Sequence, residues 1–230
     1  MKLLLFDIDL TLIDSARSGR RAMILAFEKL FGIKDGMDKV NFAGRTDRAI
    51  FRDALIHQGM EWQKEKEENF KGVYFEQLKI EIAKPNSEKH LEPGVLELLN
   101  ELSKREDNVL GLLTGNWHEG AQMKLEHFNL YHFFELGAFA DDSENRNELP
   151  QFAAQRFSEK TALSISPENV FIIGDTPLDI ACAKSFRAKS VAVATGFFSY
   201  EDLEAAQPDF LFPDFSVIQS FLKILETGAR

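Results

Sequence analysis

The chain has 230 residues, 44% of them apolar and 28% charged, which is the composition of an ordinary globular protein with one or two domains. Its formal net charge of −10 argues against nucleic acid as a partner, because the phosphates would be repelled. The single cysteine, Cys182, excludes an internal disulfide framework and fits a reducing compartment. Asp7 interrupts the apolar amino terminus, so neither a signal peptide nor a membrane span is expected. These features predict a cytoplasmic protein with no membrane partner.

The first residues predict a buried strand that ends in two aspartates. Residues 2–6 form an apolar run without alternation, which is typical of a strand buried on both faces of a parallel sheet. Asp7 and Asp9 follow at the carboxyl end of that strand, where parallel sheets gather their ligands. The two carboxylates would face one site if the strand persisted, and a cation between them would offset their repulsion. For this pair alone, the alternative is two solvated aspartates in a turn.

A block of helices is expected next, because apolar residues recur at helical spacing up to two proline-containing breakers. Three helices are predicted: the first ends at Gly32, the second runs from residue 46 or 47 towards Gln58, and the third covers residues 61–83. We expect residues 15–89 to form an all-helical cap domain that is inserted after the first strand, while residues 1–14 and 90–230 form the core.

From Gly94 onwards the predicted elements alternate between helices and apolar strands. Strands are expected over residues 109–113, 136–140, 170–173, 191–194 and 210–212, and helices over 95–102, 117–128, 149–163, from 176 or 177 onwards, and 215–225. Alternation of this kind indicates a doubly wound parallel sheet. The predicted fold class is therefore α/β, with an inserted all-helical cap domain.

Three of the predicted strands end in side chains that offer oxygen donors, namely Asp7 and Asp9, Thr114 and Asn116, and Asp175 with Asp179 four residues on. Carboxylates without a histidine or a thiolate describe a hard oxygen site, which suits Mg²⁺ better than zinc. His118 follows one of these strand ends, where we expect a surface residue, and Cys182 is expected to be a small core residue.

Taken in order, these motifs resemble the haloacid dehalogenase superfamily over nearly the whole chain. Residues 7–11, with the sequence DIDLT, are similar to its first motif, residues 113–116 to its second, and residues 174–179 to its acidic fourth motif. The helical insertion resembles the cap of that superfamily, and residues 191–196 resemble a segment of its phosphoglycolate-phosphatase-like members.

The resemblance implies a catalytic role for each motif. Asp7 would be the nucleophile, Asp9 the general acid and base, and Thr114 a hydroxyl donor to the phosphoryl oxygens, with Asn116 beside it. The metal site implied for Mg²⁺ consists of Asp7, Asp9, Asp175 and Asp179.

Two positions depart from the pattern of the superfamily. Leu10 stands where the first motif usually has glycine, so the turn after Asp9 must accommodate a side chain. The third motif is normally a lysine, and residues 141–150 contain none. Arg146 is the only cation in that segment, and we assign it the place of the lysine, although its planar fork is not equivalent to a point charge. The alternative for Arg146 is a solvated loop residue.

The expected function is Mg²⁺-dependent hydrolysis of a small phosphorylated metabolite through an aspartyl-phosphate, by a monomer or homodimer. Arg45 and Thr46, in the predicted cap loop, are the candidates for reading the alcohol part of the substrate. Alternatively, Thr46 or Asp47 only caps the next helix and Arg45 is solvated. A phosphomutase would use the same residues, and a catalytically weak binding protein would explain the missing lysine. A 2-haloacid dehalogenase does not need a carboxylate at the position of Asp9, so Asp9 favours a phosphoester as the substrate.

Overall fold

The structure is a computed structural model, and it describes residues 1–227. The strands are β1 (Lys2–Phe6), β2 (Ile13–Asp14), β3 (His90–Leu91), β4 (Asn108–Leu113), β5 (Leu136–Ala138), β6 (Val170–Gly174), β7 (Lys189–Val193) and β8 (Phe210–Phe212). The α-helices are α1 (Ser18–Phe31), α2 (Asp47–His57), α3 (Lys64–Ala83), α4 (Val95–Leu102), α5 (His118–His127), α6 (Leu149–Thr161), α7 (Pro177–Phe186), α8 (Tyr200–Ala205) and α9 (Ile218–Thr227). Short 3₁₀ helices cover η1 (Tyr131–Phe133), η2 (Arg146–Glu148) and η3 (Pro167–Asn169).

Six parallel strands form the main sheet, in the order β5-β4-β1-β6-β7-β8. The chain moves outward from β1 through β4 to β5, and then returns to the other side of β1 with β6. A reversal of this kind defines a doubly wound sheet and places the ligand crevice at the carboxyl ends of the central strands. The predicted fold class is thereby confirmed.

Helices cover both faces of the sheet, and β1 explains why its sequence shows no alternation. Leu4 and Phe6 pack into the cluster that includes α4 and α9, whereas Leu3 and Leu5 pack into the cluster that includes α6 and α7. Each of these four side chains is fully buried. A strand with apolar layers on both faces must be apolar at every position.

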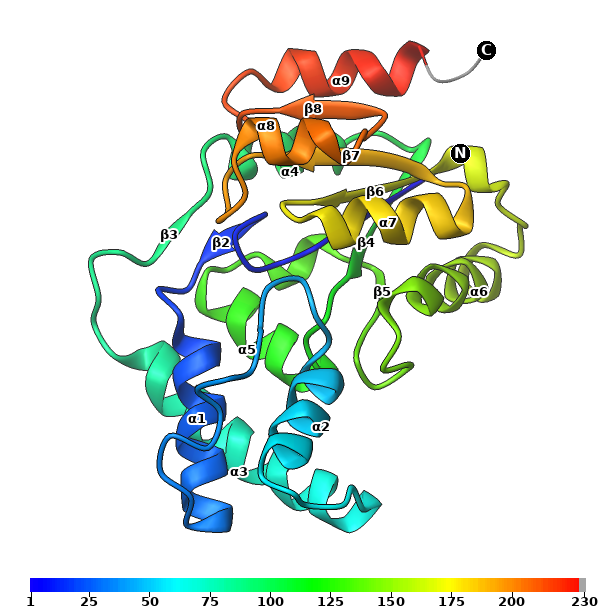
Figure 1. Cartoon of the computed structure of the whole chain (residues 1–230). Coiled ribbons are helices and arrows are strands. Elements are labelled where there is room, and N and C mark those ends of the chain that lie inside the picture. Colours follow the sequence, from blue (N-terminus) through cyan, green and yellow to red (C-terminus); the bar gives the residue numbers. More distant parts are fainter. Residues whose placement is uncertain (228–230) are drawn as a thin grey trace.

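The helical insertion (residues 15–89) packs as a separate layer below the sheet in Figure 1. Its helices α1, α2 and α3 share one apolar cluster, in which Phe51 stacks on Phe70 with ring centroids 4.3 Å apart. Trp117, which belongs to the core, is buried in the same cluster and contacts Phe70 and Tyr74. The insertion is therefore seated on the core through shared apolar packing.

The chain enters and leaves the insertion through a two-stranded ribbon. β2 and β3 pair in antiparallel fashion, with Ile13 opposite Leu91 and Asp14 opposite His90. The expected boundaries, between residues 14 and 15 and between 89 and 90, lie at this ribbon. The division into two domains stays a prediction.

Most of the predicted elements are present, with shifted ends. The helix expected to end at Gly32 begins only at Ser18, because Ala16 and Arg17 adopt positive φ angles of 49° and 60°. The strand expected over 191–194 starts earlier, at Lys189, and pairs with β6 and β8. Within residues 1–227, no helix is both long enough and apolar enough to cross a membrane.

Candidate active site

Three buried aspartates meet at the carboxyl ends of the central strands. Asp7 follows β1, Asp175 follows β6, and Asp179 lies in the first turn of α7. One carboxylate oxygen from each residue lies within 4.8 Å of the others. A β-carbon at Gly196 would collide with the carboxylate of Asp175, so the loop after β7 closes tightly over this group.

Arg146 reaches the carboxylates from η2. Its Nη2 atom lies 2.5 Å from Oδ1 of Asp179 and 3.3 Å from Oδ2 of Asp7, and the residue is 7% exposed. The thiol of Cys182 on α7 donates to the main-chain carbonyl of Arg146 at 3.2 Å, and this hydrogen bond holds η2 against α7. Burial raises the pKa of this thiol to about 12, so Cys182 acts as a core residue and not as a thiolate nucleophile. Arg146 therefore occupies a buried position between two carboxylates.

The electrostatics of this cluster favour a bound divalent cation. Burial raises the pKa of Asp7 to about 6, against the charge of Arg146, and it raises the pKa of Asp175 well above its usual range. Asp179 raises both pKa values further by like-charge repulsion. One guanidinium does not neutralise three buried carboxylates, and a hard cation among oxygen donors would do so. The donor set fits a divalent metal ion of the Mg²⁺ type.

Asp179 also closes the start of α7. Its Oδ2 atom accepts hydrogen bonds from the main-chain N–H of Thr176 at 3.1 Å and from its hydroxyl at 2.7 Å, which completes a capping box. Its other oxygen faces Arg146. Both carboxylate oxygens of Asp179 therefore already have partners within the protein. Asp7 and Asp175 are the better candidates for binding a metal ion directly.

Thr114 and Asn116 extend the site beyond β4. The hydroxyl of Thr114 is buried and hydrogen-bonded to Asp7, which opposes the rise in the pKa of that carboxyl. Asn116 donates from Nδ2 to this hydroxyl at 2.8 Å. The same amide nitrogen lies 3.0 Å from Oδ2 of Asp9. Thr114 and Asn116 thus connect the two aspartates of the first motif.

The carboxylates that lie close enough to share one metal ion are Asp7, Asp175 and Asp179, without Asp9, whose role as a metal ligand stays a prediction. The Oδ2 atom of Asp9 lies 2.5 Å from Nζ of Lys124, a residue of α5 that is 3% exposed. The hydroxyl of Ser15 is 3.4 Å from Oδ1 of Asp9. Sequence reasoning missed Lys124 altogether. The available signal was its position beside Ala121 and Leu125 on the apolar face of a helix, where an unpaired lysine is rare.

The loop before α2 covers the strand ends from the insertion (Figure 1). The carbonyl of Gly44 accepts from Nη1 of Arg146 at 3.1 Å, and the N–H of Asp47 donates to the carbonyl of Gly115 at 2.6 Å. A β-carbon at Gly115 would collide with the carbonyl of Arg45. Backbone therefore meets backbone at Gly115, where a residue with a β-carbon would not fit.

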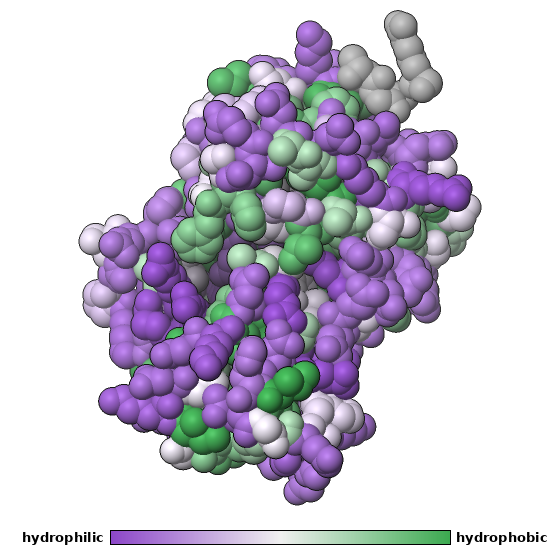
Figure 2. Space-filling view, in the orientation of Figure 1, coloured by the Kyte–Doolittle hydropathy of each residue, from purple (hydrophilic) through white to green (hydrophobic). Residues whose placement is uncertain are grey.

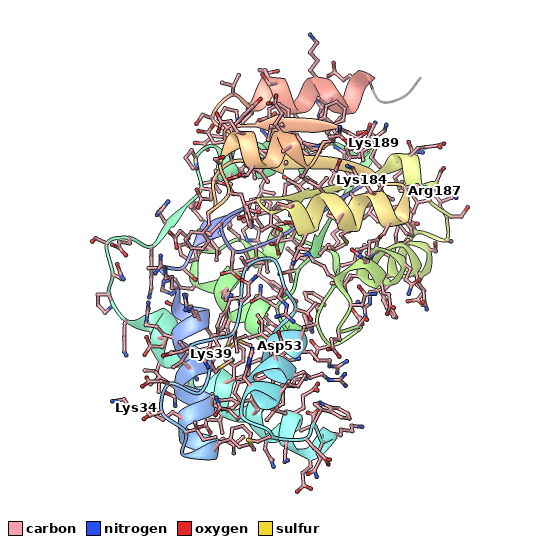
Figure 3. The ribbon with its side chains drawn as sticks, viewed as in Figure 1. Lys34, Lys39, Asp53, Lys184, Arg187 and Lys189 are labelled. Atoms are coloured by element: carbon pink, nitrogen blue, oxygen red, sulfur yellow. The ribbon has the colours of Figure 1, made fainter. Side chains whose placement is uncertain are left out.

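The two predicted substrate residues of this loop are engaged within the protein. Thr46 caps α2 by accepting from the N–H of Ala49 at 3.2 Å, and it donates to the carbonyl of Glu144 at 2.7 Å. Arg45 pairs with Asp53, which Figure 3 labels on α2. The structure thus places Thr46 and Arg45 beside the carboxylate cluster and not among its members, and their role toward a substrate stays a prediction.

Residues 4–193 match the family of haloacid dehalogenase-like hydrolases. The chain belongs to this family. It is 26% identical to the phosphoglycolate phosphatase of Nitrosococcus oceani, over 97% of this chain and 94% of that protein. It is also 31% identical to the pyrophosphatase PpaX of Bacillus cereus, over 51% of this chain and 52% of the relative.

The solved structures agree with this assignment. The crystal structure of a predicted phosphatase from Clostridium acetobutylicum is 25% identical, with a TM-score of 0.71 and 98% coverage of both chains. The expected enzyme class, a phosphatase of the haloacid dehalogenase family, is confirmed by these relatives together with the family match.

The backbone conformation of Leu10, after the second aspartate of the first motif, explains why the family usually has glycine at this position. Leu10 has a φ angle of 61°, a left-handed conformation that disfavours residues with a β-carbon. The turn is fixed because the N–H of Leu10 donates to the carbonyl of Ile13, and its own carbonyl accepts from Thr195. Thr11, the last residue of the motif, donates its hydroxyl to Oδ1 of Asp175 at 3.2 Å. Thr11 is a second buried partner that sequence reasoning did not assign to the site.

Figure 2 shows a largely hydrophilic surface on this face of the hydrolase, with scattered apolar patches. Two exposed arginines near the start of the insertion lie over aromatic rings: Arg17 is 5.5 Å from the ring centre of Phe197, and Arg20 is 5.1 Å from that of Phe42. Within residues 1–227, neither arginine forms an ion pair with a carboxylate. Both guanidinium groups thus remain available to an anion at the surface.

Other basic residues lie far from the site. Figure 3 shows Lys184, Arg187 and Lys189 near the end of α7 and the start of β7, at the edge of the sheet opposite the carboxylates. His118 is exposed and contacts the hydroxyl of Tyr131 at 3.1 Å. None of these side chains can serve a phosphoryl group that is bound near Asp7.

Proposed function

We propose that this enzyme is a Mg²⁺-dependent phosphatase that hydrolyses a small phosphorylated metabolite through an aspartyl-phosphate on Asp7. The observation that carries the proposal is the cluster of Asp7, Asp175 and Asp179 with Arg146 at the carboxyl ends of β1 and β6. Phosphate-monoester hydrolysis needs charge neutralisation and positioning above all, and this cluster offers both in a buried place.

Asp7 is the nucleophile in this proposal. A carboxylate oxygen of Asp7 attacks phosphorus, and the bond between phosphorus and the alcohol oxygen breaks as the aspartyl-phosphate forms. Asp9 gives a proton to the departing alkoxide. Asp9 then takes a proton from water, which attacks phosphorus and releases inorganic phosphate from Asp7.

The surrounding donors stabilise the phosphoryl oxygens. Thr114 presents a hydroxyl at the end of β4 with the amide of Asn116 hydrogen-bonded to it, and Arg146 presents a planar cation beside Asp7. Asp7 and Asp175 would hold Mg²⁺ through carboxylate oxygens, while Asp179 orients Arg146 and the start of α7. When bound, the metal ion would neutralise charge on the phosphoryl group and on the attacking carboxylate.

Two exposed arginines support a small anionic substrate. Arg17 and Arg20 have no carboxylate partners among residues 1–227, in a chain with a net charge of −10. The curated relatives are named for phosphoglycolate and for pyrophosphate, and each of these compounds carries a second anionic group. A phosphate ester with a second negative charge is therefore the substrate class that we propose.

Release of inorganic phosphate tests the proposal. The purified chain should release phosphate from an aryl phosphate and from a panel of small phosphorylated acids, with Mg²⁺ present and after chelation. Asp7→Asn should abolish turnover, because no carboxylate remains to form the covalent intermediate. Turnover by this variant at the wild-type rate would refute Asp7 as the nucleophile.

A further inference from the structure

A lysine of the core lies buried between the second aspartate of the first motif and the helical insertion. Nζ of Lys124 is 2.5 Å from Oδ2 of Asp9 and 2.6 Å from Oδ1 of Asn116. Asn116 in turn donates from Nδ2 to the same oxygen of Asp9 at 3.0 Å. Lysine is almost never this deeply buried without a partner, and loss of the partner would leave a charge uncompensated. The three side chains form one closed hydrogen-bonded unit.

Each helix of the insertion contributes a group near this ammonium. A β-carbon at Gly19 of α1 would lie 3.0 Å from Nζ of Lys124 and 3.7 Å from the hydroxyl of Tyr74 on α3. On α2, burial raises the pKa of Asp47 to about 7, and the nearby charge of Lys124 opposes that rise. The ammonium is thus enclosed only while the insertion is seated on the core.

We propose that Lys124 is a positioning residue, which holds the carboxylate of Asp9 in place and links its orientation to the seating of the insertion. The inference rests on the proposed function, in which Asp9 serves the leaving alcohol and the attacking water. An ion pair is strong in a buried setting and weak in water. When the insertion is packed on the core, Lys124 and Asn116 hold the carboxylate of Asp9 in one orientation. When the insertion moves away, water reaches the ion pair between Lys124 and Asp9 and weakens it.

The two cations of the site serve different aspartates. Arg146 contacts Asp7 and Asp179 on the side of the nucleophile, whereas Lys124 contacts Asp9 on the side of proton transfer. Loss of Lys124 should therefore affect the step that needs a proton, and should spare the charge that surrounds the phosphoryl group.

Lys124→Met tests this assignment, because it keeps the length of the side chain and removes the charge. We expect kcat/KM for an alkyl phosphate to fall about 10–100-fold, the range typical of losing the partner that orients an active-site ligand. For an aryl phosphate with a good leaving group, kcat/KM should fall less than threefold, because that leaving group needs little protonation. The diagnostic quantity is kcat/KM for the alkyl phosphate divided by kcat/KM for the aryl phosphate.

A double variant tests whether Lys124 acts through Asp9. Asp9→Asn should lower the same ratio, and the combination of Asp9→Asn with Lys124→Met should lower it no further. Lys71→Met is the matched control, since Lys71 also bridges insertion and core, through Asp141 at 2.8 Å, but does not touch Asp9. The control should leave the ratio unchanged.

Gly19→Ala provides a second perturbation in case Lys124→Met fails to fold. The added methyl group presses on the ammonium of Lys124, whereas Gly72→Ala on α3 meets nothing within 4 Å and serves as its control. A lowered ratio in Gly19→Ala relative to Gly72→Ala supports the inference, and equal ratios overturn it.

The outcomes separate this inference from the proposed function. An unselective loss in Asp9→Asn contradicts the acid role of Asp9 and with it the proposed mechanism. A selective loss in Asp9→Asn together with an unselective or additive loss in Lys124→Met overturns the role of Lys124 alone.

Discussion

The carbonyl oxygen of Gly44 accepts a hydrogen bond from Nη1 of Arg146 at 3.1 Å. The other terminal nitrogen of the same guanidinium faces Asp7 and Asp179. One side chain therefore joins the loop of the insertion to the carboxylates of the core. The hydrogen bond to Gly44 therefore adds a contact from the insertion to the core contacts by which Asp7 and Asp179 hold the guanidinium.

Arg146→Ala should lower kcat about 10²–10³-fold, the loss expected for one preorganised charge-stabilising donor. Arg146→Lys keeps the charge but cannot contact both carboxylates and Gly44 with a rigid fork, so its kcat should fall between those of the wild type and the alanine variant. Steady-state kinetics with an aryl phosphate measures both. Wild-type kcat in Arg146→Ala would show that Arg146 does not replace the lysine of the family.

Mg²⁺ should stabilise the folded protein as well as support turnover. At a concentration of about 100 times its Kd, a ligand that binds only the native state adds about 2.7 kcal/mol to the free energy of unfolding. Thermal or urea unfolding with and without Mg²⁺ measures this gain. Asp175→Asn should lose it, whereas Asp209→Asn, on the far side of β7, should retain it. An equal gain in both variants would contradict the metal site.

Glu92 should make the stability of the protein fall as the pH rises. Burial raises the pKa of this carboxyl from about 4.5 to about 7, with His90 lowering it and Asp14 raising it. The folded state then retains a proton that the unfolded state loses, so stability falls between about pH 4.5 and pH 7 and is constant above that window.

Glu92→Gln should remove this pH dependence. The variant should match the wild type near pH 4 and exceed it at pH 8 by at most about 3 kcal/mol, as 1.36 kcal/mol per pKa unit implies. Urea unfolding across that pH range measures the difference. A wild-type pH profile in Glu92→Gln would contradict the raised pKa.

Replacement of Leu10 tests the strain in the turn of the first motif. Leu10→Gly relieves the left-handed conformation, and Leu10→Ala removes the same side-chain contacts while it retains the β-carbon. The glycine variant should therefore be more stable than the alanine variant by about 1 kcal/mol. Equal free energies of unfolding in the two variants would show that the turn is not strained.

The exposed arginines near the start of the insertion should discriminate among substrates. Arg17→Ala and Arg20→Ala should raise KM for a phosphate ester with a second anionic group, and should leave an uncharged aryl phosphate nearly unaffected. Arg45→Ala tests the cap-loop prediction in the same assay, although Arg45 pairs with Asp53. Lys34→Ala is the control, since Figure 3 shows Lys34 at the end of the insertion away from the sheet. A uniform change across substrates would indicate altered seating of the insertion instead.

The sheet and its carboxylates could be predicted because their signals are local. An apolar run followed by aspartates identifies a buried strand and its functional end, as at Asp7 and Asp175. The absence of a lysine in residues 141–150 identified Arg146, and the structure places that guanidinium beside Asp7 and Asp179. The strand ends follow from the period of a strand and the geometry of a parallel sheet, whereas the place of Arg146 follows from the resemblance to the third motif of the superfamily.

The partner of Asp9 could not be predicted because it depends on tertiary packing. Lys124 is 115 positions away along the chain, and its place on the apolar face of α5 indicates a buried charge but not the residue that pairs with it. The pairing of Arg45 with Asp53 likewise depends on how the loop folds back against α2. Periodicity assigns a residue to a face of its own element, but not to the partner that the face will meet.

The β2–β3 ribbon has a consequence for how this enzyme could diversify. Ile13 and Asp14 pair directly with Leu91 and His90, so both chain crossings between core and insertion lie side by side in one hydrogen-bonded ladder. Segments whose ends are adjacent can be exchanged with little disturbance to the host domain. The whole intervening segment can therefore be replaced as one unit. Such a replacement exchanges Arg17, Arg20 and the loop before α2 together, while the strand ends that carry Asp7 and Asp175 stay unchanged.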